Sequence, residues 1–371
     1  LISTILFVIY TFSSIKSIPK NFRIKKNEKY LKLANNSLDN IAEALLTGDS
    51  GNIEKNSRML KKYLGNDFFT TFMLFNSSLI KNDLNESLKY LRVLESIPKA
   101  KYVAERGKIV LLLKNNNQKE AKKTLLNLCK KYPNDIWFHE KLSRIYAFEG
   151  NWELAHDSIS HLTKIPDELK SNLANLKILI GAEPLDAYKL SNNSVPVVNE
   201  TIKFYIDHQN FKKATEVLGK SWNQLLCLDL IKTFMQYKVT GDREALKRYK
   251  LVVKVLKKYI NEESNETKLS LAFASFEAKI WGEAQKYLEQ IKKTERDQRV
   301  LKLYKKISEY TKDEKTLSND EKLLPEPKWK CSSCNSEKKE WQLICENCSE
   351  FGKIIWSKSK LSRQIEIDFF K

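Results

Sequence analysis

The sequence predicts an all-helical protein made of repeated helix pairs, preceded by part of a transmembrane helix and followed by a small zinc ribbon. Three observations support this: few strand-like alternating runs, a recurring 34-residue spacing, and two Cys-x-x-Cys motifs near the C-terminus. The chain has 371 residues, 42% of them apolar, with only 10 glycines and 8 prolines. A chain of this length and apolar content can bury a sizeable core, which argues against global disorder.

Basic residues outnumber acidic residues, so the chain has a formal net charge of +19. Such an excess fits a nucleic-acid partner or an anionic membrane surface, and it also fits lysine-rich solvated helix faces. Aromatic and basic residues are not interleaved in the way that stacks nucleic-acid bases. We therefore expect no specific nucleic-acid partner.

The N-terminal segment is apolar and then basic. Residues 1–15 carry no charge and read LISTILFVIYTFSSI. This run is shorter than the about 20 residues of a bilayer span, so we interpret residues 1–18 as part of a transmembrane helix, with a signal peptide and a buried core helix as the alternatives. Residues 19–32 form a basic juxtamembrane segment that would contact anionic lipids. The positive-inside rule places this flank and the rest of the chain in the cytoplasm.

Residues 33–310 predict a helical repeat domain. Four leucines recur at a spacing of 34 residues, and a mostly small residue stands seven positions before each of them, after a turn signal. This is the tetratricopeptide pattern, in which two antiparallel helices form each unit and the small residue lets them approach. The leucines are Leu60, Leu94, Leu128 and Leu162, and the residues seven before them are Ile53, Ser87, Ala121 and Ala155.

The spacing loosens after Pro166, where three further turn-plus-helix starts predict degenerate repeats. We expect a longer link near residues 192–196 and a polar linker at residues 311–327. The three helix starts lie at residues 210–214, 241–245 and 281–284.

A tetratricopeptide array presents a concave groove lined by the first helix of each pair. By the repeat register, Arg106, Trp137, Glu140 and Arg144 are candidates to line this groove and to contact a protein partner. The alternative for Trp137 is packing in the core. These residues do not identify the ligand of the groove.

Residues 328–357 contain two Cys-x-x-Cys motifs separated by ten residues. This spacing supplies four thiolates to a tetrahedral zinc ion, and a site with four protein ligands leaves no open position for catalysis. Structural zinc is the predicted cofactor, and iron is the alternative because a rubredoxin-like centre has the same ligands. Residues 358–371 would follow as a C-terminal tail. The predicted ligands are Cys331, Cys334, Cys345 and Cys348.

The sequence contains no glycine pattern typical of dinucleotide or phosphate binding. Its four histidines form no metal-ligand constellation, and no nucleophile and base are arranged for catalysis. We therefore predict a protein that is not an enzyme, with no catalytic residues and no cofactor-binding residues besides the four cysteines.

Over nearly its whole length the sequence resembles the HemY family of haem-biosynthesis-associated bacterial inner-membrane proteins, in the form that carries a C-terminal zinc ribbon. The apolar and basic N-terminal segments, the turn Gly48-Asp49 and the segment FKKATEVLGKSW at residues 211–222 carry part of the resemblance. The strongest part is WKCSSCNSEKKEWQLICENCSEFGKIIW at residues 329–356. Asn335 and Ser349 depart from the glycines that are usual after each motif.

The resemblance implies a scaffold or regulator at the cytoplasmic face of the inner membrane that recruits other proteins, such as haem-pathway enzymes, with no known reaction of its own. The sequence is also similar to the lipopolysaccharide assembly protein B family, which acts as an adaptor to a membrane protease controlling lipid A synthesis. Trp222, Trp341 and Trp356 favour the first resemblance. A porphyrin- or haem-binding protein is the third hypothesis.

Overall fold

The computed structural model describes residues 28–65, 67–260, 264–311 and 323–357. The predicted transmembrane segment, residues 1–18, lies outside the described residues, as do most of the basic segment and the C-terminal tail. Within the described ranges, no helix has both the length and the apolarity needed to cross a bilayer. The chain divides into two compact units, residues 1–133 and 134–371, and each is described by itself.

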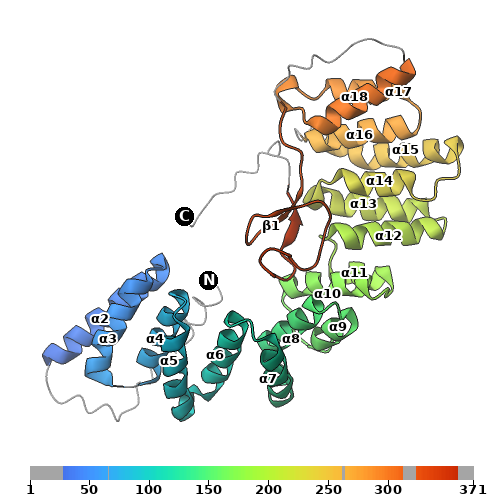
Figure 1. The fold of residues 1–371 in the computed structure, drawn as a ribbon. Coiled ribbons are helices and arrows are strands. Elements are labelled where there is room, and N and C mark those ends of the chain that lie inside the picture. The colour runs from blue at the N-terminus through green and yellow to red at the C-terminus, as the bar shows by residue number, and fades with distance from the viewer. Residues whose placement is uncertain (1–27, 66, 261–263, 312–322, 358–371) are drawn as a thin grey trace. The chain divides into compact units, whose positions relative to one another are not determined.

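The first unit consists of antiparallel helix pairs in which consecutive helices pack against each other (Figure 1). A short 3-10 helix, η2 (Pro98–Ala100), precedes its third pair. The α-helices are α2 (Glu28–Thr47), α3 (Ser50–Leu64), α4 (Phe68–Ile80), α5 (Leu84–Ser96), α6 (Lys101–Lys114) and α7 (Gln118–Lys131).

The second unit continues the helix pairs and ends in a small sheet. Its 3-10 helices are η3 (Lys257–Tyr259) and η4 (Lys293–Glu295). Its α-helices are α8 (Ile136–Phe148), α9 (Trp152–Ser160), α10 (Asp167–Leu179), α11 (Pro184–Leu190), α12 (Val195–Asp207), α13 (Phe211–Leu225), α14 (Leu228–Gln236), α15 (Asp242–Leu256), α16 (Asn265–Glu277), α17 (Trp281–Glu289) and α18 (Gln298–Thr311).

The tetratricopeptide-type helical solenoid predicted from the sequence is confirmed. Each small-residue position lies on the second helix of a pair and is almost fully buried, Ile53 included. The side chains of three turn residues cap these helices: Asp49 accepts a hydrogen bond from the backbone N–H of Asn52, Asp83 from that of Glu86, and Asn117 from that of Glu120. Asn151, before α9, makes no such bond. A short polar side chain at this position satisfies an N–H group that the helix itself leaves free. The spacing therefore predicted both the helix starts and their buried faces.

The small residues lie where two helices cross. The Ser87 hydroxyl donates to the Ser78 hydroxyl of the preceding helix at 2.8 Å. In the second unit, the Ser143 hydroxyl of α8 donates to the carbonyl of Ala155 in α9 at 2.7 Å. Both contacts bring backbones close together, which a bulky residue at the crossing would prevent.

Replacing Ala155 by leucine should therefore destabilise the second unit by about 1–3 kcal/mol, because Ala155 is fully buried at the α8–α9 crossing and extra methylenes would overpack it. Urea unfolding followed by circular dichroism measures the change. Glu153→Leu places the same side chain on an exposed position of α9 and is the control. Equal stability of the two variants would contradict the repeat register that places Ala155 at the helix crossing.

The looser repeats also begin where predicted, with α13, α15 and α17 starting at or next to the three turn signals. The longer link expected near residues 192–196 is wrong, since only residues 191–194 separate α11 from α12. Pro196 lies in the first turn of α12, where its fixed φ and missing N–H are favourable. The irregular spacing comes instead from α11, which has only 7 residues.

The C-terminal sheet has three short antiparallel strands, β1 (Trp329–Cys331), β2 (Glu337–Lys338) and β3 (Ile354–Trp356), in the order β2-β1-β3. The last residues of the expected linker lie against the repeats before the chain enters the sheet. There the Leu324 backbone N–H donates to the Arg296 carbonyl at 2.9 Å. Residues 312–322 of that linker lie outside the described residues.

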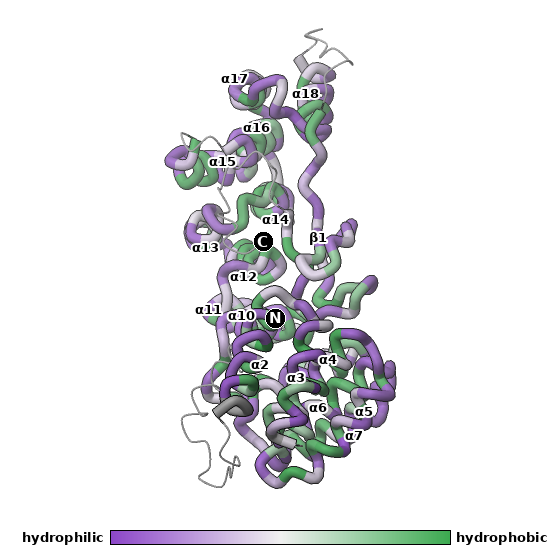
Figure 2. The backbone as a smooth tube through the Cα atoms, turned by 90° about the vertical axis from the view of Figure 1, so that its left-hand side faces the viewer, coloured by the Kyte–Doolittle hydropathy of each residue, from purple (hydrophilic) through white to green (hydrophobic). Residues whose placement is uncertain are grey.

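The ribbon shares its hydrophobic core with the repeats of the second unit. Trp329 and Ile354 belong to the cluster built by α12 to α18, and Leu343 and Phe351 belong to the cluster built by α8 to α10. In Figure 1 the ribbon lies beside α10 to α14. Figure 2 shows hydrophilic and hydrophobic residues alternating along the helices, as expected for helices with one buried face. The ribbon is therefore an integral layer of this unit.

Candidate metal centre

Two equivalent turns carry the four cysteines. In the first turn, the Asn335 backbone N–H donates to the Cys331 carbonyl at 2.9 Å, and in the second the Ser349 N–H donates to the Cys345 carbonyl at 2.7 Å. Asn335 and Ser349 have φ values of 58° and 54°, in the left-handed region that favours glycine. The backbone thus keeps the usual geometry of these turns despite the departure in residue type.

The four thiols converge on one point. Their Sγ atoms all lie within 4.8 Å of one another. Cys331 and Cys348 are separated by 3.6 Å, and Cys334 and Cys345 by 3.7 Å. A tetrahedral zinc ion with bonds of about 2.3 Å would place its sulfur ligands about 3.8 Å apart. The four predicted ligands are therefore arranged to hold a metal ion, and a set of four sulfurs suits zinc or iron.

The surroundings of the thiols differ. Hydrogen bonds from Asn347 and Ser336 lower the pKa of Cys334 to about 5, whereas burial raises the pKa of Cys348 to about 12. A bound cation deprotonates all its thiol ligands, so metal binding would release protons mainly from the thiols with the higher pKa. The chain thus holds the four sulfurs within reach of the same ion.

The aromatic residues around the cysteines form part of the larger core. The Trp329 and Trp356 rings pack edge to face with centroids 5.2 Å apart. Trp341 packs against both the core of α8 to α10 and the core of α12 to α18. The fold of the metal centre therefore depends on the repeats as well as on its own turns.

Polar contacts add to this docking. Arg144 on α8 donates two hydrogen bonds to the Glu350 carboxylate, at 3.3 and 3.2 Å. Lys353 of the ribbon pairs with Glu168 on α10. Both ion pairs lie next to the second cysteine turn, so they fix the metal centre against the first helices of two repeats.

The proposed groove residues are divided between the two units. Trp137, Glu140 and Arg144 all lie on α8, whereas Arg106 lies on α6 of the first unit, above the Tyr102 ring. Glu140 pairs with Lys141 at 2.9 Å, and Trp137 is half-buried. Arg144 contacts the ribbon of the same chain. A role for these residues in binding a partner stays a prediction.

Gly352→Ala should weaken the docking of the ribbon. Gly352 has a φ of +66°, and an added Cβ would lie 1.8 Å from Oδ1 of Asn172 on α10. We expect a loss of about 1–3 kcal/mol from the strained backbone and the displaced Asn172. Urea unfolding followed by tryptophan fluorescence measures it. Gly282→Ala on α17, where a Cβ meets nothing within 4 Å, is the matched control, and an equal effect there would contradict the contact.

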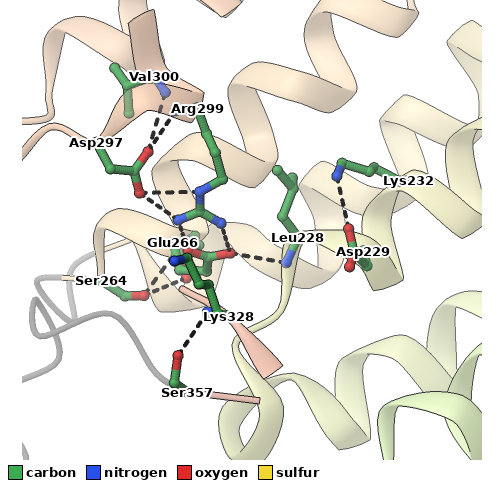
Figure 3. Close-up of polar contacts among 11 residues, drawn as sticks. Leu228, Asp229, Lys232, Ser264, Glu266, Asp297, Arg299, Val300, Lys328 and Ser357 are labelled. Carbon is green, nitrogen blue, oxygen red and sulfur yellow. Dashed lines mark hydrogen bonds and ion pairs between the residues drawn. The ribbon is translucent and has the colours of Figure 1, made fainter. Parts of the chain in front are cut away.

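A buried ionic cluster that no sequence motif indicates joins three helices (Figure 3). Arg299 on α18 donates to both carboxylate oxygens of Glu266 on α16, at 2.9 and 2.7 Å, and it contacts Asp297 at 2.7 Å. Glu266 also accepts from the backbone N–H of Leu228 at the start of α14. Burial lowers the pKa of Arg299, but Glu266 and Asp297 outweigh it and raise the pKa above its ordinary value. Glu266 and Arg299 lie 33 positions apart in the sequence, and no spacing pattern indicates that they form an ion pair.

Comparisons with protein-family models and with curated proteins gave no match. Among solved structures, the chain is similar to the APC/C hetero-tetramer Cut9-Hcn1, at 14% identity and a TM-score of 0.28, over 80% of this chain and 58% of that one. It is similar to Naa15/Naa10 bound to HypK-THB, at 11% identity and a TM-score of 0.31, over 77% of this chain and 58% of that one. It is also similar to the P58(IPK) TPR domain, at 13% identity and a TM-score of 0.22, over 78% of this chain and 99% of that one.

The chain spans 58% of the length of each of the first two of these structures. At these identities the likeness concerns the helical-repeat fold alone. The tetratricopeptide-type assignment rests on the helix pairs and their register within each unit.

Proposed function

We propose that this protein is a non-enzymatic scaffold that recruits other proteins to the cytoplasmic face of a bacterial inner membrane. The observation that carries the proposal is the construction of the second unit, in which the repeats and a four-cysteine ribbon share one core. A metal held by four protein sulfurs has no open position for a substrate, so its role would be to stabilise this platform. Helical repeats offer extended surfaces for protein partners.

The membrane anchor and the link to haem biosynthesis are proposed from the sequence. The apolar residues 1–15 and the basic residues after them support a membrane anchor with the repeats in the cytoplasm. The resemblance of residues 329–356 to the HemY ribbon supports a link to haem biosynthesis. We propose that the partners are enzymes that make or metallate porphyrins.

Crosslinking the full-length protein in its native membranes, followed by identification of the captured proteins, tests this proposal. Ferrochelatase or another haem-pathway enzyme should be captured, and a strain lacking the protein should accumulate porphyrin precursors. Capture of a membrane protease and lipid A enzymes, with normal porphyrin levels, would favour the lipopolysaccharide adaptor instead.

Absorption spectroscopy distinguishes a porphyrin-binding protein from a scaffold that only recruits enzymes. The purified protein should leave the absorption spectrum of added porphyrin unchanged if it only recruits enzymes. A saturable shift of the porphyrin absorption band would mean that the protein carries the pigment itself.

A further inference from the structure

A groove runs between the ribbon and the repeats of the second unit, with a cavity volume of about 770 Å³. Its helical walls come from α14, α16 and α18, and its other wall is one face of the ribbon sheet. The strand register places Lys338, Trp329 and Trp356 in one row across that sheet, and all three line the groove. The groove therefore exists only while the ribbon is docked.

The floor of the groove is apolar and carries one unused hydrogen-bond donor. Phe273 and Phe276 of α16 and Trp356 of β3 are half-buried there. The indole N–H of Trp356 is buried and has no acceptor among the described residues. A buried donor without a partner is unfavourable, so a ligand that brings an acceptor oxygen, and whose entry turns the Trp356 ring toward the groove, would gain free energy.

The rim of the groove is basic. Seven lysine and arginine side chains line it, against three carboxylates. Each of the three carboxylates pairs with one lysine of the lining. Lys306 on α18 and Lys339 beside β2 are exposed and form no ion pair within the described part of the chain. Arg299 and Lys338 pair with carboxylates outside the lining. Among the described residues, Lys306 and Lys339 on opposite walls therefore remain available to pair with an acidic ligand.

We propose that this groove binds an acidic segment of a partner protein that carries an aromatic or large aliphatic side chain. The apolar side chain would contact Phe273, Phe276 and Trp356, and a backbone or carboxylate oxygen would accept from the Trp356 indole. The acidic side chains would pair with Lys306 and Lys339. The inference rests on the proposed scaffold function and gives it a recognition site, but it requires neither a membrane nor a link to haem.

A peptide fits this groove better than a nucleic acid or a lipid surface. Asp229, Glu326 and Glu337 occupy three lysines of the lining, so the unpaired lysines are separate points and do not form a continuous basic row. A peptide with separate acidic side chains matches such points better than a continuous row of phosphates does. Strand β2 lies at the edge of the sheet, and its residues Glu337 and Lys338 line the groove. A peptide can add backbone hydrogen bonds to such an edge.

Fluorescence anisotropy with the purified full-length protein tests the proposal. The probe is a short fluorescein-labelled peptide in which glutamates flank a phenylalanine, and its competitor series contains the same peptide with glutamine for glutamate or alanine for phenylalanine. The double variant Lys306→Glu, Lys339→Glu should bind the probe at least about tenfold more weakly, equivalent to about 1.4 kcal/mol. Raising the salt concentration should weaken wild-type binding as well.

The matched control is Lys305→Glu combined with Lys220→Glu, because Lys305 is the exposed neighbour of Lys306 on α18 and Lys220 lies on α13, and neither lines this groove. Its affinity should stay within about twofold of wild type, because neither side chain lines the groove and salt weakens the interactions of exposed charges. Trp356→Phe keeps a ring but removes the indole donor, so it should weaken binding with the metal content unchanged. Equal losses in both double variants would overturn the proposal, because they would report net charge alone.

Three further results would overturn it. One is equal affinity for the glutamine peptide. Another is stronger displacement of the probe by single-stranded DNA or anionic vesicles than by the acidic peptide. The last is binding at least about tenfold tighter by a chain ending at Ser357, which would identify residues 358–371 as the occupant of the groove. All these measurements report direct peptide binding to the groove. A negative result would therefore reject the peptide site without rejecting the scaffold function, which the crosslinking experiment tests.

Discussion

Cys345→Ser is expected to remove the metal and to destabilise the repeats of the second unit. The sulfur of Cys345 is buried, and Cys345 belongs to the same core cluster as residues of α12 to α18. Without the metal the ribbon is too short to hold its fold, so Trp329, Leu343, Phe351 and Ile354 would leave the core. Each such side chain contributes about 1.5–3 kcal/mol when fully buried, so the four contribute at most about 6–12 kcal/mol. A detached ribbon still buries part of this surface, so we expect a loss on the order of 5 kcal/mol.

The measurements are metal content per chain and urea unfolding of the second unit by tryptophan fluorescence. Helical circular dichroism should persist in the variant, because the helix pairs keep their own contacts. Cys129→Ser, a substitution of the same kind at a buried cysteine of the first unit, should retain the metal. A full equivalent of metal in Cys345→Ser, or unchanged unfolding of the repeats after the metal is lost, would contradict the shared core.

The convergence of the four cysteines could be predicted because the geometry of each turn is local. Each Cys-x-x-Cys turn is closed by hydrogen bonds within a few residues, as between Asn335 and Cys331. The docking of the ribbon could not be predicted in the same way. It depends on Arg144 meeting Glu350 and Lys353 meeting Glu168, and no periodicity relates residues so far apart.

The repeat domain gives the same contrast. Small residues such as Ala121 and Ala155 mark helix crossings because a fixed repeat brings them to equivalent places, and the structure buries both. The longer link expected near residues 192–196 is not present, because Pro196 lies in the first turn of α12, where a proline is as favourable as it is in a loop. A proline restrains φ in both settings, so only the packing of α12 decides between them.

Replacing Arg299 by methionine should be as damaging as losing the metal, although Arg299 lies in neither motif. Methionine keeps an unbranched apolar chain but leaves the buried carboxylates of Glu266 and Asp297 without their common partner. Breaking a buried ion pair on one side typically costs about 3–5 kcal/mol, because the remaining charge stays desolvated. Denaturant unfolding of the second unit measures the loss, and Arg243→Met at an exposed position of α15 is the control.

The rescue of this variant separates charge from packing. Adding Glu266→Gln to Arg299→Met removes one unpaired charge while keeping an oxygen that can accept from the Leu228 backbone N–H. The double variant should therefore be more stable than Arg299→Met alone, and the difference between the two reports the cost of the stranded carboxylate. If the double variant were less stable than Arg299→Met, the charge of Glu266 would not be the source of the loss. The cluster would then act through the fit of its side chains between α14, α16 and α18.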